Sequence, residues 1–232
     1  MSTAAILLCA GKGERLGMGV EKALVPLGGR PLFTWSLEAL EKCAAIDAIV
    51  VVGPVAKLKD AMAASGFAPH KILGWTEGGK ERQHSVGRGL HLLPEDVTHV
   101  AVHDCARALV TPQLIANVVA DARTHGAAIA AVALEDTLKR VSLGTIEQTI
   151  PRAGLWRAQT SQAFRRDWLA EAHEAAGKTL ATDDAGLLEA LGRHVHVTPG
   201  ASSNLKVTTP EDLAFAEGWL QTRGVAREGA DR

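Results

Sequence analysis

The chain has 232 residues, of which 47% are hydrophobic and 22% are charged, with a formal net charge of −1. This length fits one large α/β domain or two small ones, and the hydrophobic content is sufficient for a packed core. The nearly neutral charge argues against a protein that grips a nucleic acid backbone. We find no apolar run long enough to span a membrane and no signal peptide, so we expect a cytoplasmic protein that binds neither nucleic acid nor membrane.

The first predicted element is a buried strand, Ala4–Leu8, that runs directly into a glycine-rich loop. The loop has the spacing Gly11-x-Gly13-x-Arg15-x-Gly17, with Lys22 further on. Glycines allow backbone N–H groups to approach phosphates closely, and Arg15 and Lys22 add two cations. Neither the Walker pattern nor the dinucleotide fingerprint is present. By itself the loop therefore fits an ordinary strand-to-helix turn as well as a polyphosphate site.

Strands and helices then alternate along the chain. The predicted strands are Ala48–Val52, His99–Val102 and Ala127–Ala133, and the predicted helices are Pro31–Ala44, Glu81–Leu93 and Thr111–His125. Thr111-Pro112 and Thr209-Pro210 are typical helix starts. This alternation predicts an α/β fold with a parallel or mixed sheet and helices on both faces. Ligands of such sheets bind at the carboxyl ends of the strands, where the glycine loop falls.

Three further groups of polar or glycine residues lie at the ends of predicted strands or helices, where a binding site could form. His103-Asp104 follows a strand, and a carboxylate there can bind Mg²⁺, although a salt bridge with Arg107 is the common alternative. We expect His103 to be a structural hydrogen-bonding group. The loop Gly78–Ser85 enters a helix and either caps it or contacts a base or ribose. Lys206 is predicted to lie at the end of a late strand, where it is either a solvated charge or part of the site.

One segment interrupts the alternation. Residues Glu135–Gln148 predict a β-hairpin with its turn at Gly144, which must bury its apolar side on its own domain or on another subunit. Cys9, Cys43 and Cys105 have no metal-ligand spacing and are expected to be core thiols. The charged segment 224–232 is expected to be disordered.

These motifs resemble those of the 2-C-methyl-D-erythritol 4-phosphate cytidylyltransferases of the non-mevalonate isoprenoid pathway, in the same order over about residues 4 to 220. The likeness extends to Asp136–Arg140, Arg152, Thr160-x-Gln162, Thr182-Asp183 and Asn204–Leu213. Many nucleotidyltransferases share the glycine loop, whereas the His-Asp-x-Ala-Arg and Asn-x-Lys-Val-Thr segments are much more specific. The chain departs from the family pattern at Cys9, Glu21, Lys80 and Ala108-Leu109.

The resemblance implies a Rossmann-like three-layer α/β fold of the nucleotide-diphospho-sugar transferase type, with a mixed, mostly parallel sheet and a protruding β-hairpin arm. It implies one nucleotidyltransferase domain over residues 1–223, whose arm at about 134–154 forms a homodimer.

The implied activity is direct in-line transfer of the cytidylyl group of CTP to methylerythritol phosphate, with Mg²⁺ or another divalent cation. The implied catalytic cations are Arg15, Lys22 and Lys206, and Asp104 would bind the metal. The implied nucleotide-binding residues are Cys9, Ala10, Gly11, Gly13, Gly78, Gly79, Arg82, Ser85 and Cys105. The implied polyol phosphate contacts are Arg107, Thr137, Arg152, Thr160 and Thr182.

Three alternatives are compatible with the same residues. A ribitol 5-phosphate cytidylyltransferase would share the fold and the chemistry. A sugar-1-phosphate nucleotidyltransferase would use UTP or GTP in place of CTP. A nucleotide-binding regulator without activity is the third, and the full set of charged groups speaks against it.

Overall fold

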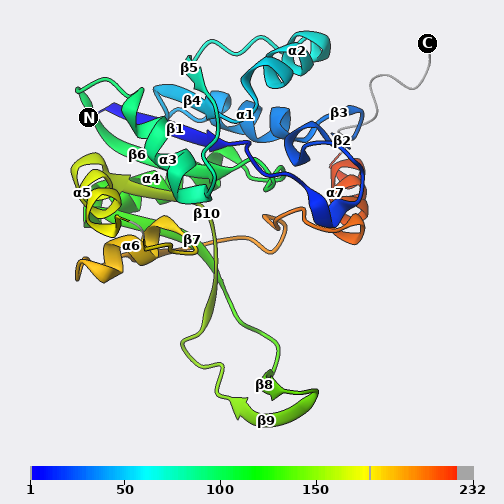
Figure 1. The fold of residues 1–232 in the computed structure, drawn as a ribbon, viewed down its shortest axis with the longest axis vertical. Coiled ribbons are helices and arrows are strands. Elements are labelled where there is room, and N and C mark those ends of the chain that lie inside the picture. Colours follow the sequence, from blue (N-terminus) through cyan, green and yellow to red (C-terminus); the bar gives the residue numbers. More distant parts are fainter. Residues whose placement is uncertain (1, 178, 224–232) are drawn as a thin grey trace.

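A seven-stranded mixed sheet forms the centre of the computed structural model, which describes residues 2–177 and 179–223. The strand order is β11-β7-β10-β6-β1-β4-β5 (Figure 1). The strands are β1 (Ser2–Leu8), β4 (Ala48–Val52), β5 (Ile72–Thr76), β6 (Val97–Asp104), β7 (Ala127–Ala133), β10 (Trp156–Arg165) and β11 (His196–Pro199). Strand β10 is antiparallel to both neighbours, and the other pairings are parallel. The predicted disordered tail, 224–232, lies outside the described residues.

Helices cover both faces of the sheet and make the three layers of the predicted fold. One hydrophobic cluster joins the sheet to α1 (Leu32–Lys42), α2 (Val55–Ser65), α4 (Pro112–His125) and α7 (Pro210–Thr222). A second cluster joins the opposite face to α3 (Arg82–His91), α5 (Arg166–Ala176) and α6 (Asp184–Ala190). In β1, Ala5 and Leu7 belong to the first cluster and Ala4, Ile6 and Leu8 to the second. Because side chains alternate along a strand, a strand buried on both faces is apolar throughout.

Most of the predicted elements are confirmed. The strands Ala48–Val52 and Ala127–Ala133 have the predicted bounds, and the three predicted helices agree to within two residues at each end. The predicted strand His99–Val102 is longer, since β6 extends to Asp104 itself. The prediction that Lys206 ends a late strand is wrong. Strand β11 ends at Pro199, and Lys206 lies in an irregular segment beyond it. No helix within the described ranges is both long enough and apolar enough to cross a membrane.

The predicted hairpin is also confirmed, and it projects away from the sheet (Figure 1). It consists of β8 (Leu138–Ser142) and β9 (Thr145–Ile150), which pair with each other in antiparallel fashion. Its apolar side chains Val141, Leu143 and Ile146 are 55%, 103% and 59% exposed. The hairpin therefore does not bury its apolar side on its own sheet. Four short elements, η1 (Glu14–Leu16), η2 (Lys22–Leu24), β2 (Pro26–Leu27) and β3 (Arg30–Pro31), connect β1 to α1.

Candidate active site

The carboxyl ends of β1, β4 and β6 meet at one edge of the sheet. The Cys9 amide donates to the carbonyl of Val52 at 2.7 Å, and the Cys105 amide donates to that of Leu8 at 3.0 Å. These bonds make the chain leave β1 and β6 side by side. A cavity of about 480 Å³ opens there. It is lined by Leu8, Ala10, Gly11, Lys12, Arg15, Lys22, Gly79, Lys80, Glu81, Arg82, Ser85, Asp104, Cys105, Ala106 and Lys206.

The glycine loop folds back on itself so that its two predicted cations face this cavity. The Lys22 amide donates to the carbonyl of Gly11 at 3.1 Å and closes the loop. Gly13 has a φ of +74°, and a Cβ atom there would lie 3.1 Å from the Lys22 nitrogen. A side chain at position 13 would therefore be strained and crowded. Arg15 and Lys22 line both the main cavity and an adjoining pocket of about 300 Å³ that also includes Gly13.

The loop that precedes α3 packs directly against the glycine loop. A Cβ atom at Gly78 would lie 2.3 Å from the Cβ of Ala10, so glycine is needed for the two loops to meet. The Gly79 amide donates to the Ser85 hydroxyl at 3.0 Å. This contact fixes the loop against the first turns of α3, which places Gly79, Arg82 and Ser85 in the cavity wall.

Asp104 is the buried carboxylate of the cavity, and three groups hold it. Arg82 Nε donates to its Oδ1 at 3.2 Å and Lys206 Nζ donates to its Oδ2 at 2.7 Å. Its amide donates to the Thr160 hydroxyl at 3.0 Å. Burial opposes ionisation of the carboxyl, but the charges of Arg82 and Lys206 outweigh burial and hold the pKa of Asp104 well below its usual range. Asp104 is therefore an anion at neutral pH.

Positive charge is in excess around the cavity. Six cationic side chains line it against two carboxylates. The pKa of Lys22 is lowered by burial and by the nearby charges of Lys206 and Arg15. Several cations this close together favour a polyanionic ligand, because such a ligand would relieve their mutual repulsion.

A divalent cation fits this arrangement as a partner of bound phosphates. The described residues contain no group of three or more His, Cys, Asp or Glu side chains that could hold a metal ion. Mg²⁺ in proteins is commonly held by one or two carboxylates together with substrate phosphates and water. The single carboxylate of Asp104 beside a cationic cavity matches that donor set.

Several predicted residues lie outside the cavity wall. Arg107 donates from Nη1 to the carbonyl of Asn204 at 2.8 Å, so it fixes the segment that carries Lys206. Thr160 is 5% exposed and supports Asp104. Cys9 is buried, and Thr182 is an exposed residue shortly before α6. Thr137 and Arg152 belong to the arm, where Arg152 donates to the carbonyl of Glu135. The cavity of one chain therefore does not contain all the predicted substrate contacts.

His103 is a structural residue, as expected. Its ring is fully buried and lies 3.0 Å from the Ser161 hydroxyl through Nδ1. Burial lowers its pKa to about 4, so the ring is neutral at neutral pH. Sequence reasoning missed Asp184, which bonds Arg82 from behind the cavity. Asp184 follows Asp183, the N-cap of α6, and the acidic pair by itself does not point to the cavity.

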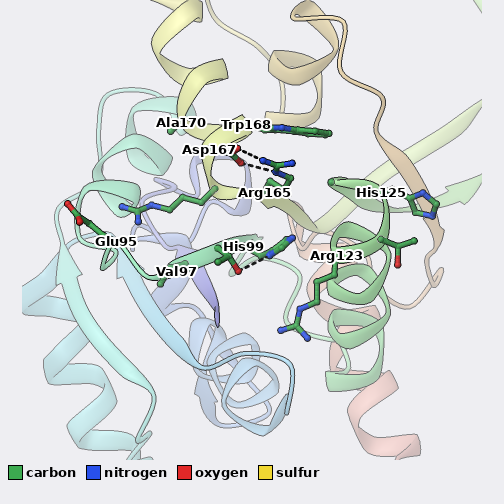
Figure 2. A pocket seen from close by; sticks show the side chains of 13 residues that line it. Glu95, Val97, His99, Arg123, His125, Arg165, Asp167, Trp168 and Ala170 are labelled. Atoms are coloured by element: carbon green, nitrogen blue, oxygen red, sulfur yellow. Dashed lines mark hydrogen bonds and ion pairs between the residues drawn. The ribbon is translucent and has the colours of Figure 1, made fainter. Parts of the chain in front are cut away.

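A larger pocket of about 780 Å³ lies at the opposite, amino end of β6 (Figure 2). Its arginines are bonded within the protein. Arg165 pairs with Asp167, Arg166 donates to the carbonyls of Leu93 and Pro94, and Arg123 donates to the Thr3 hydroxyl. Because these cations have partners in the protein, the smaller cavity is the better candidate for the active site.

Comparisons with known proteins all point to one enzyme family. The profile of the IspD family, 2-C-methyl-D-erythritol 4-phosphate cytidylyltransferase, matches residues 3–222. A curated protein of that name from Geobacillus kaustophilus is 42% identical over 228 residues, covering 96% of this chain and 99% of the relative. A crystal structure of the enzyme of that name from Thermus thermophilus is 32% identical, with a TM-score of 0.77 and coverage of 95% and 100%. The Anaerococcus prevotii 4-diphosphocytidyl-2C-methyl-D-erythritol synthase is 28% identical, with a TM-score of 0.80 and coverage of 95% and 98%.

Proposed function

The chain belongs to the 2-C-methyl-D-erythritol 4-phosphate cytidylyltransferase family, and we propose that the cavity at the carboxyl ends of β1 and β6 is its active site. The enzyme transfers the cytidylyl group of CTP to 2-C-methyl-D-erythritol 4-phosphate and releases pyrophosphate. The observation that carries the site proposal is the excess of cations around Asp104, between two loops whose glycines let them meet.

The proposed mechanism needs no nucleophile from the protein, because a phosphate oxygen of the substrate attacks the α-phosphorus of CTP. Pyrophosphate leaves from the opposite side. The protein's part is to align the two phosphates and to offset the charge that develops on the five-coordinate phosphorus. Arg15 and Lys22 bind the triphosphate from the glycine loop. Lys206, held on Asp104 at 2.7 Å, would lie beside the reacting phosphates.

Asp104 would hold Mg²⁺ together with phosphate oxygens of CTP. The bound ion supplies charge neutralisation at the phosphates. Asp104 suits this role because its carboxylate is ionised and rigidly held. The backbone around Ala10, Gly11, Gly78 and Gly79, with Arg82, Ser85 and Cys105, forms the proposed nucleotide pocket.

We further propose that the polyol phosphate site is completed by the arm of a second subunit. Residues 1–223 would form one domain, and the arm at about 134–154 would make the dimer contact. The exposed apolar side chains of the hairpin support this proposal, since a partner surface would bury them. Thr137 and Arg152 would then reach the partner's cavity, while Arg107, Thr160 and Thr182 act in their own subunit. The three buried free cysteines support a cytoplasmic location.

A pyrophosphate-release assay with four nucleotides and two polyol phosphates tests the substrate assignment. We expect CTP with methylerythritol phosphate to turn over fastest, and turnover to stop in excess EDTA. Faster release with ribitol 5-phosphate would make this a ribitol phosphate cytidylyltransferase. Preference for UTP or GTP would contradict the cytidylyl assignment, and equal turnover in EDTA would contradict the metal role of Asp104.

A further inference from the structure

A row of hydrogen-bonded ionisable side chains continues from Asp104 away from the cavity. The Arg82 guanidinium donates from Nε to Asp104 at 3.2 Å and from Nη1 to Asp184 at 2.6 Å. On the far side, His173 Nε2 lies 2.8 Å from the other oxygen of Asp184. Asp184 is the first residue of α6, is 1% exposed, and lies outside the cavity wall. Arg82 is therefore shared between two carboxylates, of which only Asp104 faces the cavity.

The burial of Asp184 needs an explanation beyond packing. Burial opposes its charge, but the hydrogen bond from His173 and the charge of Arg82 keep its pKa below the usual range. The carboxylate is thus a buried anion. Buried ion pairs are a weak source of stability, because the desolvation of both charges offsets most of their attraction. An apolar side chain at this position would serve packing at least as well.

The two contacts of Arg82 differ in a way that indicates what Asp184 does. The bond to Asp184, at 2.6 Å, is much shorter than the bond to Asp104, at 3.2 Å. Shorter charge-assisted bonds are stronger, so the guanidinium is drawn towards α6. Lys206 already occupies the other oxygen of Asp104. Each oxygen of Asp104 thus has one cationic partner, and the partner of Oδ1 is the more distant one. Without the charge of Asp184, Arg82 would bind Oδ1 more tightly.

We propose that Asp184 is a positioning residue that draws Arg82 towards α6, so that Arg82 bonds Oδ1 of Asp104 only weakly and a divalent cation can compete for that oxygen. This inference rests on the proposed role of Asp104 as the metal-binding carboxylate. His173 orients Asp184 from the other side, so that one oxygen faces Arg82.

The substitution Asp184→Asn removes the charge and keeps the shape. Binding of Mn²⁺ to the full-length enzyme would be measured by water-proton relaxation, with a saturating CTP analogue that has a methylene group between the α- and β-phosphorus. No turnover occurs in this mixture. We expect the Mn²⁺ dissociation constant to rise about 10- to 100-fold, the usual effect of losing a group that supports a metal ligand. In turnover assays, kcat at saturating Mg²⁺ should stay within about threefold of wild type, since only metal binding is weakened.

Two variants provide matched controls. Asp184→Glu keeps the charge and should recover most of the Mn²⁺ affinity. Asp183→Asn removes the neighbouring carboxylate, which caps α6 and bonds Gln162, and asparagine also caps helices well. Because Asp183 has no hydrogen bond to Arg82 within the described residues, its substitution should leave Mn²⁺ affinity unchanged.

The double variant Arg82→Gln with Asp184→Asn separates positioning from a structural role. It removes the competing cation together with its buried partner, so neither charge is left unpaired and folding is favoured over the single variant. We expect its Mn²⁺ affinity to be at least that of wild type. Wild-type affinity in Asp184→Asn, or a loss that persists in the double variant, would overturn the inference. The proposed metal site is tested separately by Asp104→Asn. If that variant binds Mn²⁺ normally, the proposed metal site and this inference both fail.

Discussion

Strand β6 has a pocket lined with charged groups at each end, and the two pockets differ in how those charges are used. At the amino end, Arg165 is paired with Asp167, and Arg166 is bonded to backbone carbonyls. At the carboxyl end, burial and the nearby charges of Lys206 and Arg15 lower the pKa of Lys22. The amino-end pocket has the larger volume, about 780 Å³ against about 480 Å³. The proposal of the carboxyl-end pocket as the phosphate site therefore rests on its excess of cations and not on its size.

The largest expected effect is on catalysis, and it comes from Lys22 in the pocket at the carboxyl end of β6. We predict that Lys22→Ala lowers kcat about 10²- to 10³-fold, the usual cost of removing one preorganised charge contact to a transition state. The KM for CTP should change less than kcat, because the charge that Lys22 offsets develops mainly in the transition state. Steady-state kinetics with purified protein measure both quantities.

A substitution in the pocket at the amino end of β6 supplies the matched control. Arg123→Ala removes a cation that donates to Thr3, at the far end of the same sheet, and should leave kcat unchanged. A normal kcat with a raised KM for CTP in Lys22→Ala would show that the lysine is a simple anchor. Equal losses of kcat in both variants would remove the distinction between the two ends.

The strands of the sheet differ in how well the sequence predicts them. Strands β1, β4 and β7 are apolar runs, so their burial can be read directly from composition. Strand β10 was missed, although it lies in the middle of the sheet. Its centre, Gln159–Gln162, is polar and buried, because these side chains bond Asp104, His103 and the segment around Asn204. Because β10 buries polar side chains that bond neighbouring segments, it does not show the usual hydrophobic pattern.

The site was predictable to the extent that its residues lie in local motifs. Arg15, Lys22, Asp104 and Lys206 all reach the cavity, since their loops follow neighbouring strands or cross that edge of the sheet. Asp184 could not be assigned from its neighbours, because an acidic pair at a helix start predicts a cap and a first-turn charge. Asp183 is that cap, whereas Asp184 is buried by the packing of α6 near α3 and α5. Only tertiary structure separates the two carboxylates.

A smaller effect is expected from mixing two inactive variants, and it tests whether the carboxyl-end site is complete in one chain. If Arg152 acts on the partner's site and Lys22 on its own, a dimer of Lys22→Ala with Arg152→Ala has one doubly altered site and one intact site. Random reassortment makes half of the dimers mixed, so activity should recover to about a quarter of wild type. The two proteins are unfolded and refolded together, and exchange is verified with differently tagged subunits. Activity that stays at the level of the single variants, after verified exchange, would show that Arg152 does not act in trans.

The smallest expected effect is on stability, and it comes from His99 in the pocket at the amino end of β6. His99 is 5% exposed, and its pKa is lowered by burial and by the charges of Arg123 and Arg165, with Asp167 acting in the opposite direction. A histidine whose pKa is lower in the folded chain contributes stability that is fully present above the ordinary pKa of 6.5 and is lost as the pH falls below it. While only the unfolded chain binds this proton, the free energy of unfolding should fall by up to about 1.4 kcal/mol per pH unit. Urea unfolding of wild type and His99→Gln between pH 7.5 and about pH 5 measures this contribution, and the variant should have the shallower slope. Identical slopes would show that His99 is protonated as readily in the folded chain as in the unfolded one, and that the amino-end arginines do not act on it.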